Sequence, residues 1–397
     1  MKLSVLLFVL SCLLSNSATI TDLKSPLWGP LEPGEFEVGF QTLWFVDESR
    51  TYQEDDILEI GSTGRPFRLM TWYPAMGDEE KPFLTFADYL SLESANPKYK
   101  KWAQTMRQKD KITARKQFNQ ENTRDSLLAV IEKLPTMAKT NLSFEDGKFP
   151  LVIHLLGLND YQEESTTLWE YLASNGYVVL VIPQIGKDAS SINTQFSAEI
   201  VEIASQDIKA SLDFLRSSEI RSHIDFEKIG LIGHSLGGAV ALHYAHENKV
   251  TSIALLDGAI YDDASKEVLK TFNFDPTKFR SEILNLYPSY HEQVTSLPLF
   301  NSLSHVNQYH VSFPKATHFD FQQWPLYAYL TGVDDPRAAN YRSTEDGYYD
   351  YFAVCRLTRS YFDGTLKEQR EAMDVLKGGK RLDYQDKCEL TFFFREN

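Results

Sequence analysis

The fold is decided by residues 228–242, which read KIGLIGHSLGGAVAL. The first five residues of this stretch form an apolar run typical of a strand, and the last five are rich in helix formers. Between them, Ser235 is flanked by Gly233 and Gly237, which tolerate the backbone angles of a very sharp turn. A strand, a tight turn around a serine and a helix are the context of a nucleophile elbow. The stretch therefore predicts that Ser235 is a catalytic nucleophile.

Strands and helices are predicted to alternate along the rest of the chain. Apolar residues recur at helical spacing in residues 165–174 and 200–215. Continuous apolar runs such as 177–182 are typical of parallel strands that are covered on both faces. This alternation predicts an α/β fold with a doubly wound, mostly parallel central sheet. The predicted strands are residues 36–45, 67–73, 149–155, 177–182, 228–232, 251–256, 297–303 and 311–313, of which the first two are antiparallel.

The segments between these elements are interpreted as insertions into one decorated domain, residues 19–397. Residues 77–147 are charged and contain helical stretches, so they form either a cap over the site or a layer that covers the sheet. Residues 259–296 are aromatic and are also predicted to be a helical insertion. A C-terminal extension begins at about residue 332, and the chain shows no internal repeat or flexible linker. In that extension, helices are predicted at 348–362 and 367–376.

The first residues are interpreted as a secretion signal. Lys2 provides a positive charge, residues 3–14 are almost entirely apolar, and residues 15–18 are small enough for cleavage. The apolar run is too short to span a bilayer as a helix. Residues 1–18 therefore predict a signal peptide and a secreted or periplasmic protein. Two alternatives remain open, a lipoprotein signal in which Cys12 carries the lipid anchor and a buried N-terminal helix.

Charge and hydropathy restrict the partners. The formal net charge of −15 argues against nucleic acid as a partner, because no basic surface exists to release counterions from phosphates. No later apolar run is long enough for a transmembrane span, so the mature protein is expected to be soluble or tethered by lipid.

The cysteines and histidines leave one structural question open. Removal of a signal behind Cys12 would leave Cys355 and Cys388, which in an oxidising compartment could form one disulfide. Two unpaired thiols are the alternative. The spacing of cysteine and histidine gives no zinc signature, so no metal is expected.

A nucleophilic serine needs a base within hydrogen-bond reach and a carboxylate that orients the base. Asp257 is the candidate acid, because it directly follows the strand at 251–256 and precedes Gly258, which allows a turn. Asp262 and Asp263 compete with it but lie further from the strand end. The next predicted strand has no carboxylate near its end, which favours Asp257.

His318 is the candidate base. It lies in a loop after the predicted strand at 311–313, late in the chain, where this arrangement of catalytic residues requires a histidine. His305 and His310 are interpreted as structural residues. Asp320, two positions later, is expected either to support His318 or to be exposed.

Two backbone N–H groups are expected to bind the oxyanion that forms during acyl transfer. One should belong to Leu236, the residue after the nucleophile. The other should come from the loop after the strand at 149–155, and Leu156 is the candidate.

Five short motifs together resemble a known family. They are WYPA at 72–75, HLLG at 154–157, GHSLGG at 233–238, LDG at 256–258 and THFDF at 317–321. This combination resembles the plasma-type platelet-activating-factor acetylhydrolases and their bacterial relatives, often called dienelactone-hydrolase-like, over residues 36–330. Val38 and Gly39, then Asp47 with Arg50, also resemble the bacterial members. The early position of the acid is more discriminating than the elbow, because cutinase-like polyester hydrolases carry the acid one strand later.

The resemblance implies an α/β-hydrolase fold that needs neither metal nor cofactor. It implies that Ser235, Asp257 and His318 form the triad, that Leu156 and Leu236 build the oxyanion hole, and that short or oxidised acyl chains are cleaved from phospholipids or simple esters. The family usually has His-Gly-Leu-Gly in the oxyanion loop, and Leu155 replaces the first glycine here.

The sequence therefore predicts a secreted serine esterase that forms a covalent acyl-enzyme on a small-molecule or lipid ester. A carbohydrate acyl esterase or a polyester hydrolase with the same triad is an alternative. A non-catalytic binding protein on a hydrolase scaffold, with its aromatic insertions as the binding surface, is a further one.

Overall fold

The computed structural model describes residues 24–118, 126–190, 195–261, 266, 268, 270–272, 274–291, 297–333, 342–379, 382 and 387–397. Only the backbone is described for residues 114–118 and 126–127. The predicted signal peptide, including Cys12, lies outside the described residues, as do Asp262 and Asp263.

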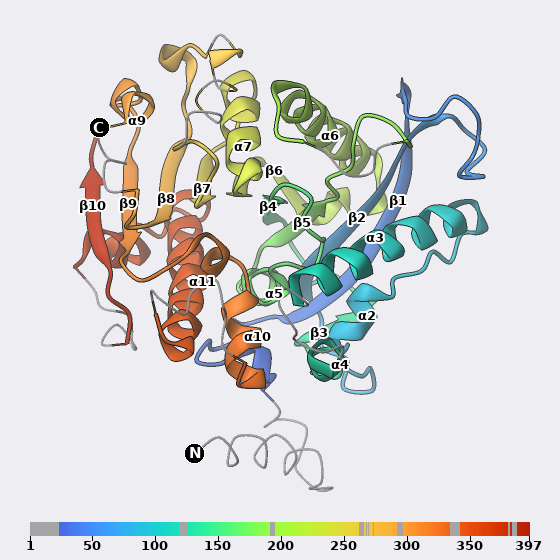
Figure 1. The fold of residues 1–397 in the computed structure, drawn as a ribbon, viewed down its shortest axis with the longest axis horizontal. Coiled ribbons are helices and arrows are strands. Elements are labelled where there is room, and N and C mark those ends of the chain that lie inside the picture. The colour runs from blue at the N-terminus through green and yellow to red at the C-terminus, as the bar shows by residue number, and fades with distance from the viewer. Residues whose placement is uncertain are drawn as a thin grey trace, which may run out of the picture.

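The described strands form one 10-stranded sheet in the order β10-β9-β8-β7-β6-β4-β5-β2-β1-β3 (Figure 1). Strands β4 to β9 are mutually parallel, whereas β2 runs antiparallel to β1 and β5, and β10 runs antiparallel to β9. The strands are β1 (Glu37–Thr51), β2 (Gly64–Ala75), β3 (Ala138–Thr140), β4 (Phe149–Leu155), β5 (Val178–Ile182), β6 (Ile224–His234), β7 (Ser252–Leu256), β8 (Glu282–Pro288), β9 (Gln308–Phe313) and β10 (Thr391–Arg395).

Helices cover both faces of the sheet. In Figure 1, α6 and α7 lie on the upper side of the sheet, and α5, α10 and α11 lie on the lower side. The α-helices are α2 (Phe86–Leu90), α3 (Lys100–Phe118), α4 (Ser126–Ile131), α5 (Thr166–Ser174), α6 (Ala198–Ser217), α7 (Leu236–Glu247), α9 (Pro298–Ser302), α10 (Trp324–Thr331) and α11 (Thr344–Leu366). The 3-10 helices are η2 (Pro26–Trp28), η3 (Pro97–Tyr99), η4 (Glu219–His223), η5 (Pro276–Lys278), η7 (His318–Phe321) and η8 (Arg370–Lys377).

An apolar core lies on each face of the sheet, between the strands and the helices that pack on them. Successive strand residues point to opposite faces, so Val152 of β4 packs in the core under α5 and α11, while Leu151 and Ile153 pack in the core under α6 and α7. This double coverage explains why β5, VVLVI, is apolar along its whole length.

The strand order reverses next to β4. The chain passes from β4 to β5 on one side and then crosses to β6 on the other side of β4. Ligands of open α/β sheets bind beyond the carboxyl ends of the strands at such a switch point. The ends of β4 and β6, which carry Leu156 and Ser235, are therefore where the topology places a site.

The predicted strand at 297–303 is wrong, and so is the interpretation of 259–296 as purely helical. Pro298 occupies the first turn of the short helix α9, a position where its missing N–H costs nothing. The strand that follows β7 is instead β8, inside the predicted insertion. Its buried Asn285 interrupts an otherwise apolar run, and Tyr261 satisfies this polar side chain through a hydroxyl 2.7 Å from Oδ1.

The C-terminal extension is part of the main fold. Helix α11 includes the helix predicted at 348–362 and packs against β6, β7 and β8, while β10 pairs with β9 as the edge strand. The segment predicted as a helix at 367–376 contains the 3-10 helix η8.

Cys355 and Cys388 form no disulfide in the structure, so the disulfide considered from the sequence is not supported. Both thiols are buried, and each faces a polar group of α11. Burial raises the pKa of the Cys355 thiol, which contacts the Tyr351 hydroxyl. Cys388 contacts the Asp350 carboxyl, and burial raises the pKa of that carboxyl to about 8.

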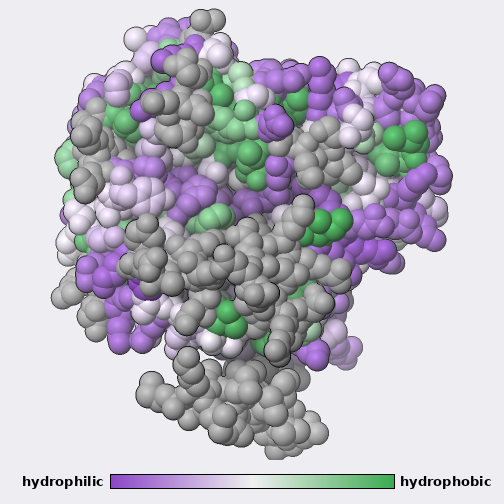
Figure 2. Space-filling model, viewed as in Figure 1, coloured by the Kyte–Doolittle hydropathy of each residue, from purple (hydrophilic) through white to green (hydrophobic). Residues whose placement is uncertain are grey.

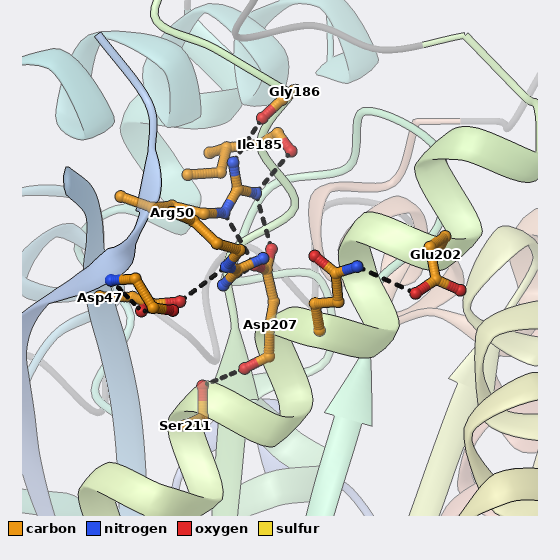
Figure 3. A network of polar contacts seen from close by, with 10 residues as sticks. Asp47, Arg50, Ile185, Gly186, Glu202, Asp207 and Ser211 are labelled. Carbon is orange, nitrogen blue, oxygen red and sulfur yellow. Dashed lines mark hydrogen bonds and ion pairs between the residues drawn. The ribbon is translucent and has the colours of Figure 1, made fainter. Parts of the chain in front are cut away.

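A buried ion-pair network ties the first two strands to α6 (Figure 3). Asp207 of α6 accepts hydrogen bonds of 2.7 Å from Arg65 of β2 through both carboxylate oxygens. Arg50 of β1 bridges Asp207 at 2.8 Å and Asp47 at 2.6 Å. Arg65 also donates to the carbonyl groups of residues 185–186. The network therefore fixes the loop that follows β5, next to the switch point.

The visible surface is mainly hydrophilic. On the face shown in Figure 2, hydrophobic residues form separate groups among hydrophilic ones. Within the described part of the chain, the helices lack the combination of length and apolar character that a bilayer crossing requires.

Candidate active site

Ser235 lies at a strained turn between β6 and α7. Its φ of 50° falls in the left-handed region, which non-glycine residues adopt rarely and mostly at functional sites. A methyl group at Gly233 would lie 2.4 Å from the carbonyl oxygen of Gly237, and one at Gly237 would lie 2.0 Å from that of Leu155. The glycines on either side of the serine are therefore required by close packing of the backbone.

Asp257 follows β7 and also has a left-handed φ, of 44°. Its backbone N–H donates to the Leu286 carbonyl of β8 at 2.8 Å, and the Ala259 N–H donates to the Ser235 carbonyl at 2.6 Å. The acid loop and the elbow are thus joined by a backbone hydrogen bond. The Asp257 side chain is only 2% exposed.

The structure brings Asp257 and His318 together. His318 Nδ1 lies 2.6 Å from Asp257 Oδ2, a short, charge-assisted type of contact. Burial alone would raise the pKa of the Asp257 carboxyl, but contacts with His291 and His318 outweigh burial and lower it. The carboxylate is therefore ionised at neutral pH and can stabilise a positive charge on His318.

His318 also lies against His234, the residue that precedes Ser235. Its ring centroid is 4.8 Å from that of His234, and His234 Nε2 lies 3.3 Å from the His318 carbonyl oxygen. The side chain of His318 is 35% exposed, and Ser235 is half-buried. Solvent can therefore reach both Ser235 and His318, while Asp257 lies buried behind the histidine.

Leu236 and Leu156 lie in the two segments that meet beside Ser235. Leu236 is the first residue of α7, and Leu156 follows β4, whose Leu155 pairs with Gly233 of β6. The first turn of α7 is so close to the end of β4 that Gly237 has no room for a side chain. Free N–H groups at a helix N-terminus point out of the helix, and here that end faces the switch point.

The candidate oxyanion loop, residues 156–165, is polar but almost entirely buried. The amide of Gln322 donates to Asp160 Oδ2 at 2.7 Å and to Glu164 Oε2 at 3.0 Å, and it lies 3.1 Å from His234 Nδ1. Gln322 follows His318 closely in the chain. One side chain therefore joins the oxyanion loop, the elbow strand and the loop of the candidate base.

The charges in this buried group are complementary. Burial, together with the Asp160 charge, raises the pKa of the Glu164 carboxyl well above its usual range. The pKa of Asp160 is lowered, because hydrogen bonds from His234 and Glu164 outweigh burial. Glu164 is therefore protonated and donates a hydrogen bond to the ionised Asp160. Burial lowers the pKa of His154 to about 3, so this ring, 3.0 Å from Glu164, is neutral.

This group also contains the side chains that could geometrically hold a cation. The residues are Asp160, Glu164 and His234, whose potential ligand atoms all lie within 4.8 Å of one another; they form the cluster of this kind in the described part of the chain. The Gln322 amide nitrogen contacts all three. A hydrogen-bond donor therefore occupies the position where these ligands converge.

Helix α3, from the segment 77–147, supports the oxyanion loop from outside. The buried Lys109 ammonium group lies 3.0 Å from the Gln184 carbonyl oxygen and 3.4 Å from that of Asp160. The Gln184 side chain in turn accepts the Asn159 N–H at 2.5 Å. The apolar residues of α3 pack on the segment after β1 and against partly buried residues of β1 itself.

Asp320 anchors the loop of His318. Its carboxylate accepts the Thr317 N–H at 2.6 Å and pairs through both oxygens with the buried Arg342 guanidinium. Asp320 is therefore buried and supports the histidine loop, one of the two roles expected for it. Arg342 was not predicted, because nothing local marks a lone arginine in the extension as its partner.

His291 was also missed. It lies in the segment after β8, and its Nε2 is 3.3 Å from Asp257 Oδ1. The sequence places this segment in a predicted insertion, where no local pattern pairs a histidine with Asp257. Recognising β8 as a strand would have placed His291 just beyond a strand end, where functional residues gather.

Comparisons with known proteins agree with this architecture. A family model described as chlorophyllase matches residues 118–263, which include Ser235 and Asp257 but end before His318. The solved structure of a ferulic acid esterase from Streptomyces cinnamoneus superposes with a TM-score of 0.63, over 91% of this chain and 98% of that one, at 18% sequence identity. The chain has the α/β-hydrolase fold. The predicted fold class is thereby confirmed.

One curated relative matches this chain over a shorter stretch of sequence. A bis(hydroxyethyl) terephthalate hydrolase from Streptomyces coelicolor (strain ATCC BAA-471 / A3(2) / M145) is 32% identical over 104 residues, which are 26% of this chain. The match spans 30% of that relative. It links this α/β-hydrolase to ester hydrolases, while the proposed acetylhydrolase family remains a prediction from motifs.

Proposed function

We propose that this α/β-hydrolase is a serine carboxylic-ester hydrolase. The observation that carries the proposal is the 2.6 Å contact between His318 and a buried, ionised Asp257, next to the strained turn of Ser235. The similarity to a bis(hydroxyethyl) terephthalate hydrolase and to a ferulic acid esterase, both ester hydrolases by name, supports it.

In the proposed mechanism, His318 Nε2 takes the proton of the Ser235 hydroxyl while Oγ attacks the ester carbonyl carbon. The N–H groups of Leu236 and Leu156 would stabilise the oxyanion that forms. When the carbonyl re-forms, the alcohol leaves with the proton from His318, and an acyl-enzyme remains. Water, deprotonated by His318, then attacks the acyl carbon and releases the acid and the serine. Asp257 stabilises the imidazolium in both steps.

Two substrate classes enter the proposal. The motif resemblance favours short acyl esters, including platelet-activating-factor-like phospholipids. The relatives favour the alternative of carbohydrate acyl esters or polyesters, because ferulic and terephthalic acids are aromatic acyl groups. The exposed Tyr290, next to His291, offers an aromatic surface near the acid loop. Rates on p-nitrophenyl acetate and butyrate, bis(hydroxyethyl) terephthalate, methyl ferulate and a short-chain phospholipid separate the classes.

The test of the catalytic proposal uses Ser235→Ala. We expect the wild type to hydrolyse p-nitrophenyl acetate and to be labelled by a fluorophosphonate at Ser235, and the variant to lose both. Ser289→Ala is the matched control, because Ser289 is half-buried and its hydroxyl donates to the Pro314 carbonyl. Absence of labelling in a folded wild type would favour the binding-protein alternative, and full turnover by Ser235→Ala would remove the serine from the mechanism.

A further inference from the structure

Asp257 is contacted by two histidines from different loops. His318 approaches Oδ2 at 2.6 Å, and His291 approaches Oδ1 at 3.3 Å. His318 Nδ1 forms a hydrogen bond with Oδ2, whereas His291 Nε2 lies at ion-pair distance from Oδ1, which has no partner with hydrogen-bond geometry among the described residues. The mechanism above uses only the contact with His318. The contact with His291 therefore needs an explanation of its own.

The position of the His291 ring is fixed by its neighbours. The ring stacks on Tyr261 with centroids 4.1 Å apart and meets Tyr290 edge-on at 4.5 Å. The Tyr261 hydroxyl is held in turn by Asn285 of β8, and the His291 N–H donates to the Pro288 carbonyl at 3.1 Å. The ring is 24% exposed, yet both its plane and its backbone are supported. Such support is typical of a side chain that orients another one.

We propose that His291 is a positioning residue that holds Asp257 through Oδ1 and reduces the basicity that Asp257 confers on His318. The proposal deepens the proposed function and rests on it, because it assigns a role at the same site. His291 does not touch the reacting atoms and acts through the acid.

The physical reason is the distribution of negative charge on the carboxylate. The charge of Asp257 stabilises protonated His318 and so raises the pH at which this base loses its proton. A second N–H donor on the other oxygen attracts part of that charge and weakens the effect.

Other groups face the same pair and remain in place in the test. Tyr290 and Tyr261 are close enough to Asp257 for its charge to affect their hydroxyls, and His234 and Asp160 lie on the other side of His318. Because the variants below leave these groups unchanged, differences between variants report on residue 291.

Two substitutions test the polar contact of residue 291 with Asp257 and its aromatic packing separately. His291→Phe keeps the aromatic stack and removes the donor, whereas His291→Gln keeps an N–H donor at the length of Nε2 and removes the stack. His291→Ala is made alongside as a second variant without a donor. His243→Phe is the matched control, because His243 also stacks on an aromatic ring, Phe272, at 4.1 Å and contacts a carboxylate, Glu202, at 2.9 Å.

The readouts are the acid limb of kcat/KM against pH and the titration of His318 by NMR, with its signal assigned by loss in His318→Gln. We expect His291→Phe and His291→Ala to move both midpoints upward by about half a unit to one unit, the effect of losing one N–H donor beside the carboxylate. His291→Gln should stay near the wild type, and His243→Phe should not move the midpoints.

An unchanged or lowered midpoint in His291→Phe would overturn the proposal, and so would equal shifts in the Phe and Gln variants. Activity that survives in His318→Gln but not in His291→Phe would reverse the two roles and overturn it as well. A wild type that hydrolyses no ester would refute the proposed function, while the NMR titration would still decide whether His291 tunes His318.

Discussion

Glu170 gives a prediction whose magnitude follows from the structure. This glutamate of α5 is fully buried, and its carboxyl accepts hydrogen bonds from Trp28 Nε1 at 2.9 Å, from the Met137 N–H at 2.9 Å and from the Tyr89 hydroxyl at 2.8 Å. Burial raises the pKa of the Glu170 carboxyl from 4.5 to about 7, because the three hydrogen bonds do not offset the lost hydration of the charge.

The sign follows from proton binding. Between about pH 4.5 and pH 7 the folded chain keeps the Glu170 proton, whereas the unfolded chain has lost it, so the free energy of unfolding falls as pH rises. The contribution is fully present below pH 4.5 and is lost as pH rises through 7. At about 1.36 kcal/mol for each pH unit, the full loss is about 3.4 kcal/mol, of which about 2.5 kcal/mol falls between pH 5 and pH 8.

Glu170→Gln removes the titration and keeps the shape of the side chain. We therefore expect the free energy of unfolding of the wild type, relative to that of the variant, to drop by about 2.5 kcal/mol from pH 5 to pH 8. Urea titrations followed by tryptophan fluorescence measure this difference, with Glu79→Gln as an exposed control. A difference between wild type and Glu170→Gln that stays constant within about 0.5 kcal/mol would show that the reasoning on burial is wrong.

Two further predictions concern the elbow and the histidine loop. Gly237→Ala places a methyl group 2.0 Å from the Leu155 carbonyl oxygen, so we expect kcat/KM to fall by about 10²-fold, while Gly379→Ala, with its nearest contact at 3.4 Å, keeps the rate. A rate near that of the wild type in Gly237→Ala would contradict the tight packing of the elbow. Arg342→Met leaves the Asp320 carboxylate buried without its ion pair and should lower the free energy of unfolding by about 3–5 kcal/mol, measured by urea titration. A loss below about 1 kcal/mol would mean that Asp320 finds another partner or a proton.

The sequence predicted the elements whose signals are local. The elbow at Ser235 needs small residues on both sides, and this requirement is visible in the glycines themselves. The strands β4, β5 and β7 are buried on both faces, so their composition is mainly apolar. The candidate acid directly follows β7 and the candidate base follows β9, which is why their positions could be predicted before any contact was known.

The errors arise where tertiary contacts override composition. β8 carries Asn285 in the sheet interior, where its side chain is satisfied by the Tyr261 hydroxyl and by His310 of β9, two contacts that composition does not reveal. Residues 297–303 are apolar like a strand, but Pro298 begins a short helix that buries Phe300 and Leu303. The edge strand β10 was missed, although its residues are typical of a strand, because it pairs only at the end of the sheet.

The buried polar loop shows most clearly that composition does not reveal tertiary contacts, and this loop has a consequence for the site. Residues 159–164 read NDYQEE, a composition typical of an exposed turn, yet their side chains are mostly buried. Gln322, which follows the candidate base, supplies the hydrogen bonds that Asp160 and Glu164 need in that environment. The loop that holds His318 and the loop that holds Leu156 therefore share one set of buried hydrogen bonds. Because breaking that set would leave buried polar groups unsatisfied, the base and the oxyanion loop must keep a fixed position relative to each other.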